Sequence, residues 1–99
     1  MTTREHYQAA YTQFVTMRDQ FFKRDEQYKN YMHYIHEQIE EIVGEIEFDL
    51  FLMLCKFYNV WYLARVETDP DYQVFNEVFG VNVSETDFKR YFNAFSQLE

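Results

Sequence analysis

Apolar side chains recur at spacings of three and four residues along the first half of the chain, and this period predicts helix. The first stripe consists of Tyr7, Ala10, Tyr11, Phe14, Met17 and Phe21. It is interrupted at Arg24 and Asp25 and resumes as Tyr28, Met32, Ile35, Ile39, Ile42 and Ile46. Thr2 and Glu5 form a capping-box pattern at the start of the first stripe.

The two stripes fit either one helix or two. Neither Gly nor Pro occurs before Gly44, and an unbroken helix over residues 3–43 would be roughly 60 Å long. A compact domain of this size has a radius of gyration of only about 13 Å. The chain therefore either bends within residues 24–30 and folds back, or extends a long arm that pairs with a second copy. The missing breaker favours a long N-terminal helix, straight or kinked, and a homodimer.

The segment 44–66 is almost continuously apolar, so its polar positions must distinguish helix from strand. At 100° per residue these positions fall on one narrow stripe, which predicts a largely buried helix. They are Glu45, Asp49, Lys56, Asn59 and Glu67. The alternative is a two-stranded hairpin within 46–67, because the residues around Trp61 favour strands. A hairpin here would make the protein α+β.

Capping signals divide the last third into two short helices. Asp69 followed by Pro70 predicts a helix start, and Gly80 predicts its end. Ser84, with Asp87 three residues later, predicts the start of a final helix. The chain is thus expected to form one all-α domain over residues 1–99, a small bundle of four or five helices.

Composition and charge narrow the class of protein. Apolar residues make up 47% of the 99 positions, which is enough for a core, and a single cysteine excludes an internal disulfide framework and a Cys-based zinc site. The N-terminus has no apolar signal segment, so we expect a cytoplasmic protein. Aromatic residues make up 21% of the chain, more than a small core easily hides, and some are expected to face a partner or a second copy.

The net charge of −8 is concentrated in one part of the sequence. No Lys or Arg occurs between Lys29 and Lys56, whereas six acids do. On a helix, one face would carry Glu37, Glu40, Glu41 and Glu45, and the opposite face Ile39, Ile42, Val43 and Ile46. Three like-charge pairs four residues apart would each cost roughly 0.2–0.5 kcal/mol; they are Glu37–Glu41, Glu41–Glu45 and Glu45–Asp49. We predict that the six acids bind a partner, the alternative being a solvated face that maintains solubility. They are Glu37, Glu40, Glu41, Glu45, Glu47 and Asp49.

Catalytic chemistry has little support in the sequence. His33, His36, Glu37 and Glu40 have the spacing of one helix side, but the stretch 36–40 lacks the second histidine of a zincin motif. Cys55 lies in an apolar segment with no identifiable base, as expected for a buried thiol. We therefore predict no enzyme, no cofactor, no metal and no catalytic residue, and keep a His/Glu metal-dependent enzyme as a minor alternative.

These features favour a non-enzymatic module that docks on a basic protein surface of the kind that grips nucleic acid. The acids would repel nucleic acid itself, so no direct binding to it is expected. In composition, though in no motif, the chain is similar to small phage-encoded inhibitors such as anti-CRISPR proteins and other nucleic-acid mimics, which implies that the partner is inhibited. The alternative is an acidic helical homodimer that acts as an adaptor or a secretion-type chaperone.

Overall fold

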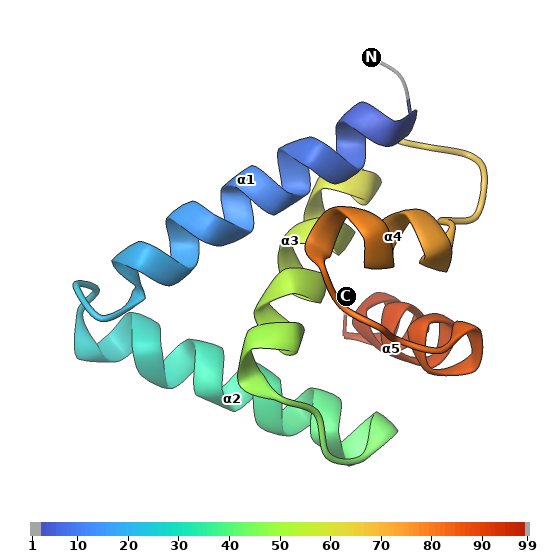
Figure 1. Ribbon diagram of the computed structural model, residues 1–99. Helices are drawn as coiled ribbons and strands as arrows, with labels where there is room; N and C mark the ends of the chain where they lie inside the picture. Colours follow the sequence, from blue (N-terminus) through green and yellow to red (C-terminus); the bar gives the residue numbers. More distant parts are fainter. Residues whose placement is uncertain (1–2, 99) are drawn as a thin grey trace.

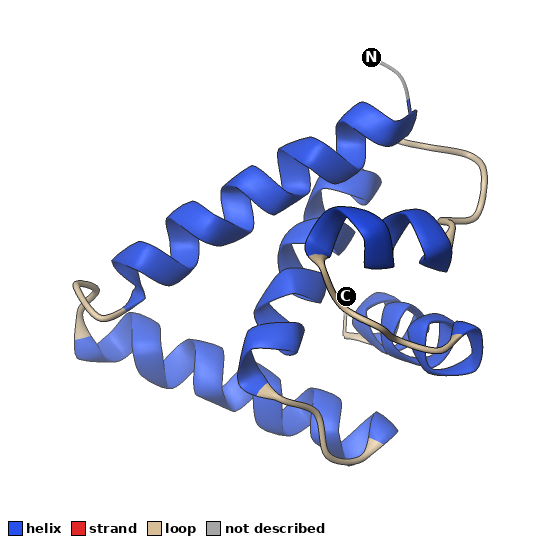
Figure 2. Ribbon diagram, in the orientation of Figure 1, coloured by secondary structure: helices blue, strands red, loops and turns tan. Residues whose placement is uncertain are grey.

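A computed structural model describes residues 3–98, and this part of the chain contains helices and loops but no strand (Figure 2). The helices are α1 (Thr3–Phe21), α2 (Glu26–Val43), α3 (Phe48–Leu63), α4 (Tyr72–Phe79) and α5 (Glu85–Gln97). The prediction of a small all-α bundle is confirmed, and the alternative hairpin within 46–67 is wrong. None of the helices is long and apolar enough to cross a membrane. The capping box predicted at Thr2 lies outside the described residues.

The predicted long N-terminal helix is wrong, because the chain turns between α1 and α2. Asp25 ends the turn: its carboxylate accepts a hydrogen bond from the backbone amide of Tyr28 across 2.8 Å and caps α2. From this corner α1 and α2 diverge like the two sides of a V (Figure 1). The bend keeps the radius of gyration at 13.1 Å, and most of both apolar stripes is buried within one molecule, with Tyr11 and Ile42 left exposed.

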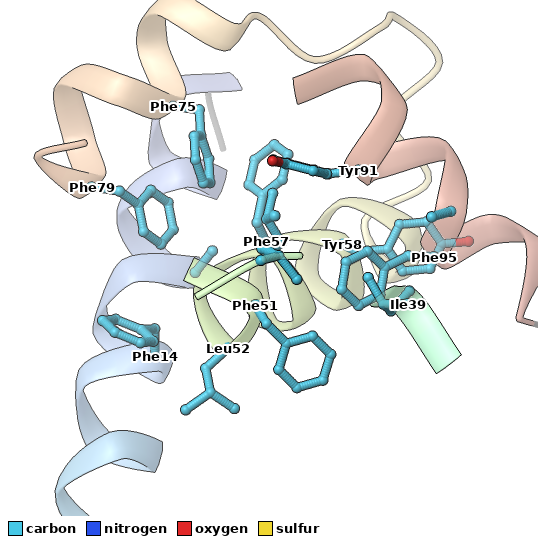
Figure 3. Packing of buried hydrophobic residues seen from close by; sticks show 14 of the residues in the cluster. Phe14, Ile39, Phe51, Leu52, Phe57, Tyr58, Phe75, Phe79, Tyr91 and Phe95 are labelled. Atoms are coloured by element: carbon cyan, nitrogen blue, oxygen red, sulfur yellow. The ribbon is translucent and has the colours of Figure 1, made fainter. Parts of the chain in front are cut away.

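Helix α3 runs through the centre of the bundle and supplies much of the core (Figures 1 and 3). Phe57 is completely buried, and its ring packs against Tyr7 of α1, Phe75 of α4 and Phe88 of α5. Twelve of the aromatic side chains belong to the buried core. An aromatic core therefore joins α1, α4 and α5 to α3, whereas α2 is anchored by Met32, Ile39 and Val43.

A Schellman motif ends α3. The amide of Arg65 donates to the carbonyl of Tyr62, and the amide of Val66 donates to that of Trp61. Arg65 adopts φ +54°, in the left-handed region where glycine is preferred. The motif turns the chain into the connector that leads to α4.

The capping predictions for α4 and α5 are largely confirmed. Gly80 has φ +68° at the end of α4, and Ser84 caps α5 by accepting from the amide of Asp87. The start of α4 lies two residues later than predicted, because Asp71 rather than Asp69 is the N-cap and accepts from the amide of Gln73. Asp71 is held there by Tyr7, whose phenolic oxygen accepts a hydrogen bond from the Asp71 amide.

Candidate functional site

The six acids predicted to bind a partner, which we call the acidic strip, do not lie on one helix. Glu37, Glu40 and Glu41 are on α2, Glu45 and Glu47 are in the connector to α3, and Asp49 is in the first turn of α3. The prediction that Glu45 shares a helical face with the others is wrong, because Gly44, with φ +87°, ends α2. Of the three predicted repulsive pairs four residues apart, only Glu37–Glu41 remains within one helix.

Glu40 has a structural task in the connector. Its Oε2 accepts a hydrogen bond from the backbone amide of Ile46 at 3.1 Å. Beside it, His36 Nε2 donates to the carbonyl oxygen of the same Ile46 at 2.8 Å and lies 3.7 Å from Glu40 Oε2. The two side chains together clamp both backbone groups of Ile46, so Glu40 is less available to a partner than its neighbours.

The other five acids of the strip are exposed and have no basic partner in the described part of the chain. Across residues 3–98, no Lys or Arg nitrogen lies within 4.0 Å of a carboxylate of the strip. Arg90 of α5 reaches the end of α2, where its Nη1 donates to the carbonyl of Val43 at 2.9 Å. Its ion pair, however, is with Asp87 at 3.0 Å. The charge of the strip is therefore presented to solvent.

The helix dipoles destabilise the carboxylates at one end of the strip and stabilise the carboxylate at the other end. Glu40 and Glu41 lie in the last turn of α2, where the helix dipole disfavours negative charge. Helix α2 has no basic residue of its own in this turn, although Arg90 of α5 donates to the Val43 carbonyl there. Asp49 lies in the first turn of α3, where the dipole favours it. The acids on α2 thus lower the stability of their own helix, whereas Asp49 supports α3.

Exposed apolar side chains share the outer side of α2 with these acids. Tyr31 is 60% exposed, Tyr34 56% and Ile42 42%. Their positions at i, i+3 and i+11 place them in one sector of the helix together with Glu41. We call Tyr31, Tyr34 and Ile42 the tyrosine face. It adds area that a protein partner could cover beside the acidic strip.

Ile42 was predicted to point inward, and that prediction is wrong. Ile39 and Val43, four residues apart, occupy the inward side of α2, which leaves Ile42 outside. The sequence reasoning also missed Tyr31 and Tyr34 as candidate contacts. Their exposure could have been predicted from their spacing, because neither tyrosine falls on the inward stripe of Met32, Ile39 and Val43.

The histidines are not brought together as metal ligands. Within residues 3–98 no group of three or more His, Cys, Asp or Glu side chains could hold a metal ion. The His33 ring stacks on Phe48, with centroids 4.9 Å apart, and His36 is engaged by Ile46. The positions His33, His36, Glu37 and Glu40 therefore do not form the constellation that the minor alternative requires.

Cys55 has the character of an unreactive thiol. Desolvation by burial raises its pKa from the usual 9.0 to about 12, and the neighbouring Lys56 only partly opposes this shift. The thiolate is the reactive form of cysteine. Cys55 therefore remains protonated at neutral pH and does not offer a nucleophile.

Comparison with known proteins adds no family to these observations. No protein-family model matches the chain, and neither a curated protein nor a solved structure matches it.

Proposed function

We propose that this protein is a non-enzymatic interaction module that docks on a basic surface of a partner protein. The contact would combine the exposed carboxylates of the acidic strip with the tyrosine face of α2. The observation that carries the proposal is the position of Glu41 and its neighbours at the C-terminal end of α2, exposed and without a Lys or Arg partner in residues 3–98. Charge that lowers the stability of its own helix is typical of a surface kept for binding.

The two parts of the contact would act at different stages. Carboxylates steer a cationic partner from a distance, which raises the association rate and makes it depend on salt. Tyrosines supply rigid area at low entropic cost and are common in the energetic centre of interfaces. A basic surface that matches this arrangement is of the kind that grips nucleic acid, so docking would compete with nucleic acid and inhibit the partner.

A matched pair of charge variants tests the proposal. The strip variant carries Glu37→Gln, Glu41→Gln and Glu45→Gln, and leaves Glu40 to its structural task. The control carries Asp19→Asn, Glu67→Gln and Asp69→Asn, three exposed acids elsewhere. Each variant loses three negative charges, so the two have the same net charge. Immobilised wild-type protein first captures partners from the native host, and interferometry then measures the affinity of each variant for the partner at several salt concentrations.

We expect the strip variant to bind at least ten-fold more weakly and with a shallower salt dependence, while the control stays within two-fold of the wild type. Nucleic acid should displace the wild-type protein from the partner. Equal losses in the two variants would show that only net charge matters and would refute a localised docking site. Unchanged binding by the strip variant would exclude the strip.

A second candidate, an acidic homodimeric adaptor or chaperone, draws on different residues. Phe22 at the corner between α1 and α2 is 81% exposed, and Leu63 at the end of α3 is 77% exposed. Neither belongs to the tyrosine face. Light scattering across the working concentration range tests this candidate, which requires a dimer that Phe22→Ser or Leu63→Ser weakens; a monomer at every concentration excludes it.

A further inference from the structure

Two adjoining grooves lie inside the angle between α1 and α2. One, of about 270 Å³, runs along α1, and the other, of about 250 Å³, lies between α2, α3 and the end of α5. Both are lined by Met17, Tyr28 and Lys56, so they adjoin, and we call the two grooves together the inner trough. Small-molecule sites commonly have volumes of about 300–1,000 Å³, and the two grooves together fall in the lower part of this range.

The charge of the inner trough is opposite to that of the rest of the protein. Among residues 3–98, its lining includes the two cations Arg24 and Lys56 and no Asp or Glu, although the chain contains 17 acids and has a net charge of −8. The three grooves around Pro70, by contrast, are all lined by Asp69, two of them by further acids, and each has one cation, Lys89 or Arg65. An acid-free groove on so acidic a protein favours an anionic ligand.

The two cations are available to such a ligand. Within residues 3–98 no carboxylate lies within 4.0 Å of the ammonium of Lys56. The Arg24 guanidinium lies over the ring of Tyr28, 4.8 Å from its centroid, which orients it beside the trough. No carboxylate of the described residues lies within 4.0 Å of its nitrogens. Beyond Lys56 the walls become apolar and include Ile35, Phe95 and Leu98.

We propose that the inner trough binds a small amphipathic carboxylate. Arg24 and Lys56 would hold its carboxylate by charge-assisted hydrogen bonds, and its aliphatic chain would lie against Tyr28, Ile35 and Leu98, where burial of each methylene favours binding. Tyr31 of the tyrosine face also lines the trough, but no acid of the acidic strip does, and the tests of the two proposals change different residues. Either proposal can therefore fail without the other.

Calorimetry with decanoate tests the site, and decyltrimethylammonium, with the same chain length and the opposite charge, is the control ligand. The methionine methyl groups report the location: Met17 and Met32 line the trough, whereas Met53 does not. We expect saturable one-to-one binding of decanoate, shifts of the Met17 and Met32 methyl signals but not of Met53, and no saturable binding of the cation. Equal binding of both ligands, or none of decanoate below its micelle concentration, would overturn the proposal.

Two lysine variants with the same change in net charge separate a specific site from general attraction. Lys56→Gln should weaken decanoate binding at least five-fold, and Lys89→Gln, whose side chain pairs with Glu85 on α5, should leave it unchanged. Thermal melting confirms that each variant is folded; if Lys56→Gln is not, the exposed Arg24→Gln takes its place with the same expected loss. Equal affinities in the wild type and the trough variant would refute the assignment.

Discussion

The phenolic oxygen of Tyr7 accepts a hydrogen bond from the backbone amide of Asp71 across 2.8 Å, although the two residues lie 64 positions apart. Tyr7 is buried in the first turns of α1, and Asp71 is the N-cap of α4. One hydroxyl group thus joins the beginning of α1 to the beginning of α4. The same burial raises the pKa of Tyr7 above its usual 10.0, although the bond from Asp71 partly opposes the rise.

Tyr7→Phe should lower the free energy of unfolding by about 1–2 kcal/mol, because it removes the acceptor of the Asp71 amide and leaves the ring in place. Urea unfolding measures the change. Tyr11→Phe, at a half-exposed position on the same helix, is the control and should change stability by less than about 0.5 kcal/mol. Equal effects of the two substitutions would show that the hydrogen bond contributes nothing specific.

Arg65→Gly should stabilise the protein by about 1 kcal/mol, since Arg65 holds a left-handed conformation that costs a side-chain-bearing residue roughly that much. Arg65→Ala removes the same charge and side chain but keeps the Cβ atom, so it should bring no gain. Thermal and urea unfolding of both variants compare them. A similar gain from alanine would mean that the arginine side chain, and not its backbone, is the unfavourable element.

Glu41→Gln should raise the free energy of unfolding by about 0.3–1 kcal/mol, because it relieves both the dipole of α2 and the repulsion from Glu37. Asp49→Asn changes the net charge equally but removes a favourable charge at the start of α3, so it should lower stability by a few tenths of a kcal/mol. Urea unfolding at low salt measures both, and the difference should shrink at high salt. Changes of the same sign would contradict this account.

Stability should fall at alkaline pH because of Cys55. Below pH 9 its thiol is protonated in both states; between pH 9 and 12 the unfolded chain loses this proton while the folded chain, with a pKa of about 12, retains it. The free energy of unfolding should then decrease by up to about 1.4 kcal/mol per pH unit. Tyr7 adds to the loss above pH 10, so the test compares the wild type with Cys55→Ala. The variant should lose less stability from pH 8 to 10; parallel curves would contradict the prediction.

Local signals in the sequence determined where α4 ends and where α5 begins. Gly80 and Ser84 act on their own backbone neighbourhood, so their roles follow from residue type and spacing alone. The position of the N-cap at Asp71 did not follow in this way. Asp69 and Asp71 are both suitable caps, and the distant hydroxyl of Tyr7 fixes the amide of one of them.

For the acidic strip, too, the sequence predicts one part of the site and the tertiary structure decides the other. The run of carboxylates between Lys29 and Lys56 is evident from the chain, but which of them a partner could reach depends on the fold. Glu40 is engaged by the amide of Ile46, while Glu41 is exposed. Sequence reasoning could not separate the two, because the connector that engages Glu40 exists only after Gly44 has ended α2.

The sequence by itself determined that this protein is helical, rich in aromatic residues and acidic over one stretch, because composition, periodicity and charge can be read along the chain. The bend between α1 and α2 became evident only from the tertiary structure, because the turn contains neither Gly nor Pro. A straight helix could not pack α1 on α3 and α2 on α5 in one compact molecule. The bend occurs because burying both apolar stripes outweighs the helical turn that is lost, and it also creates the inner trough and exposes the tyrosine face.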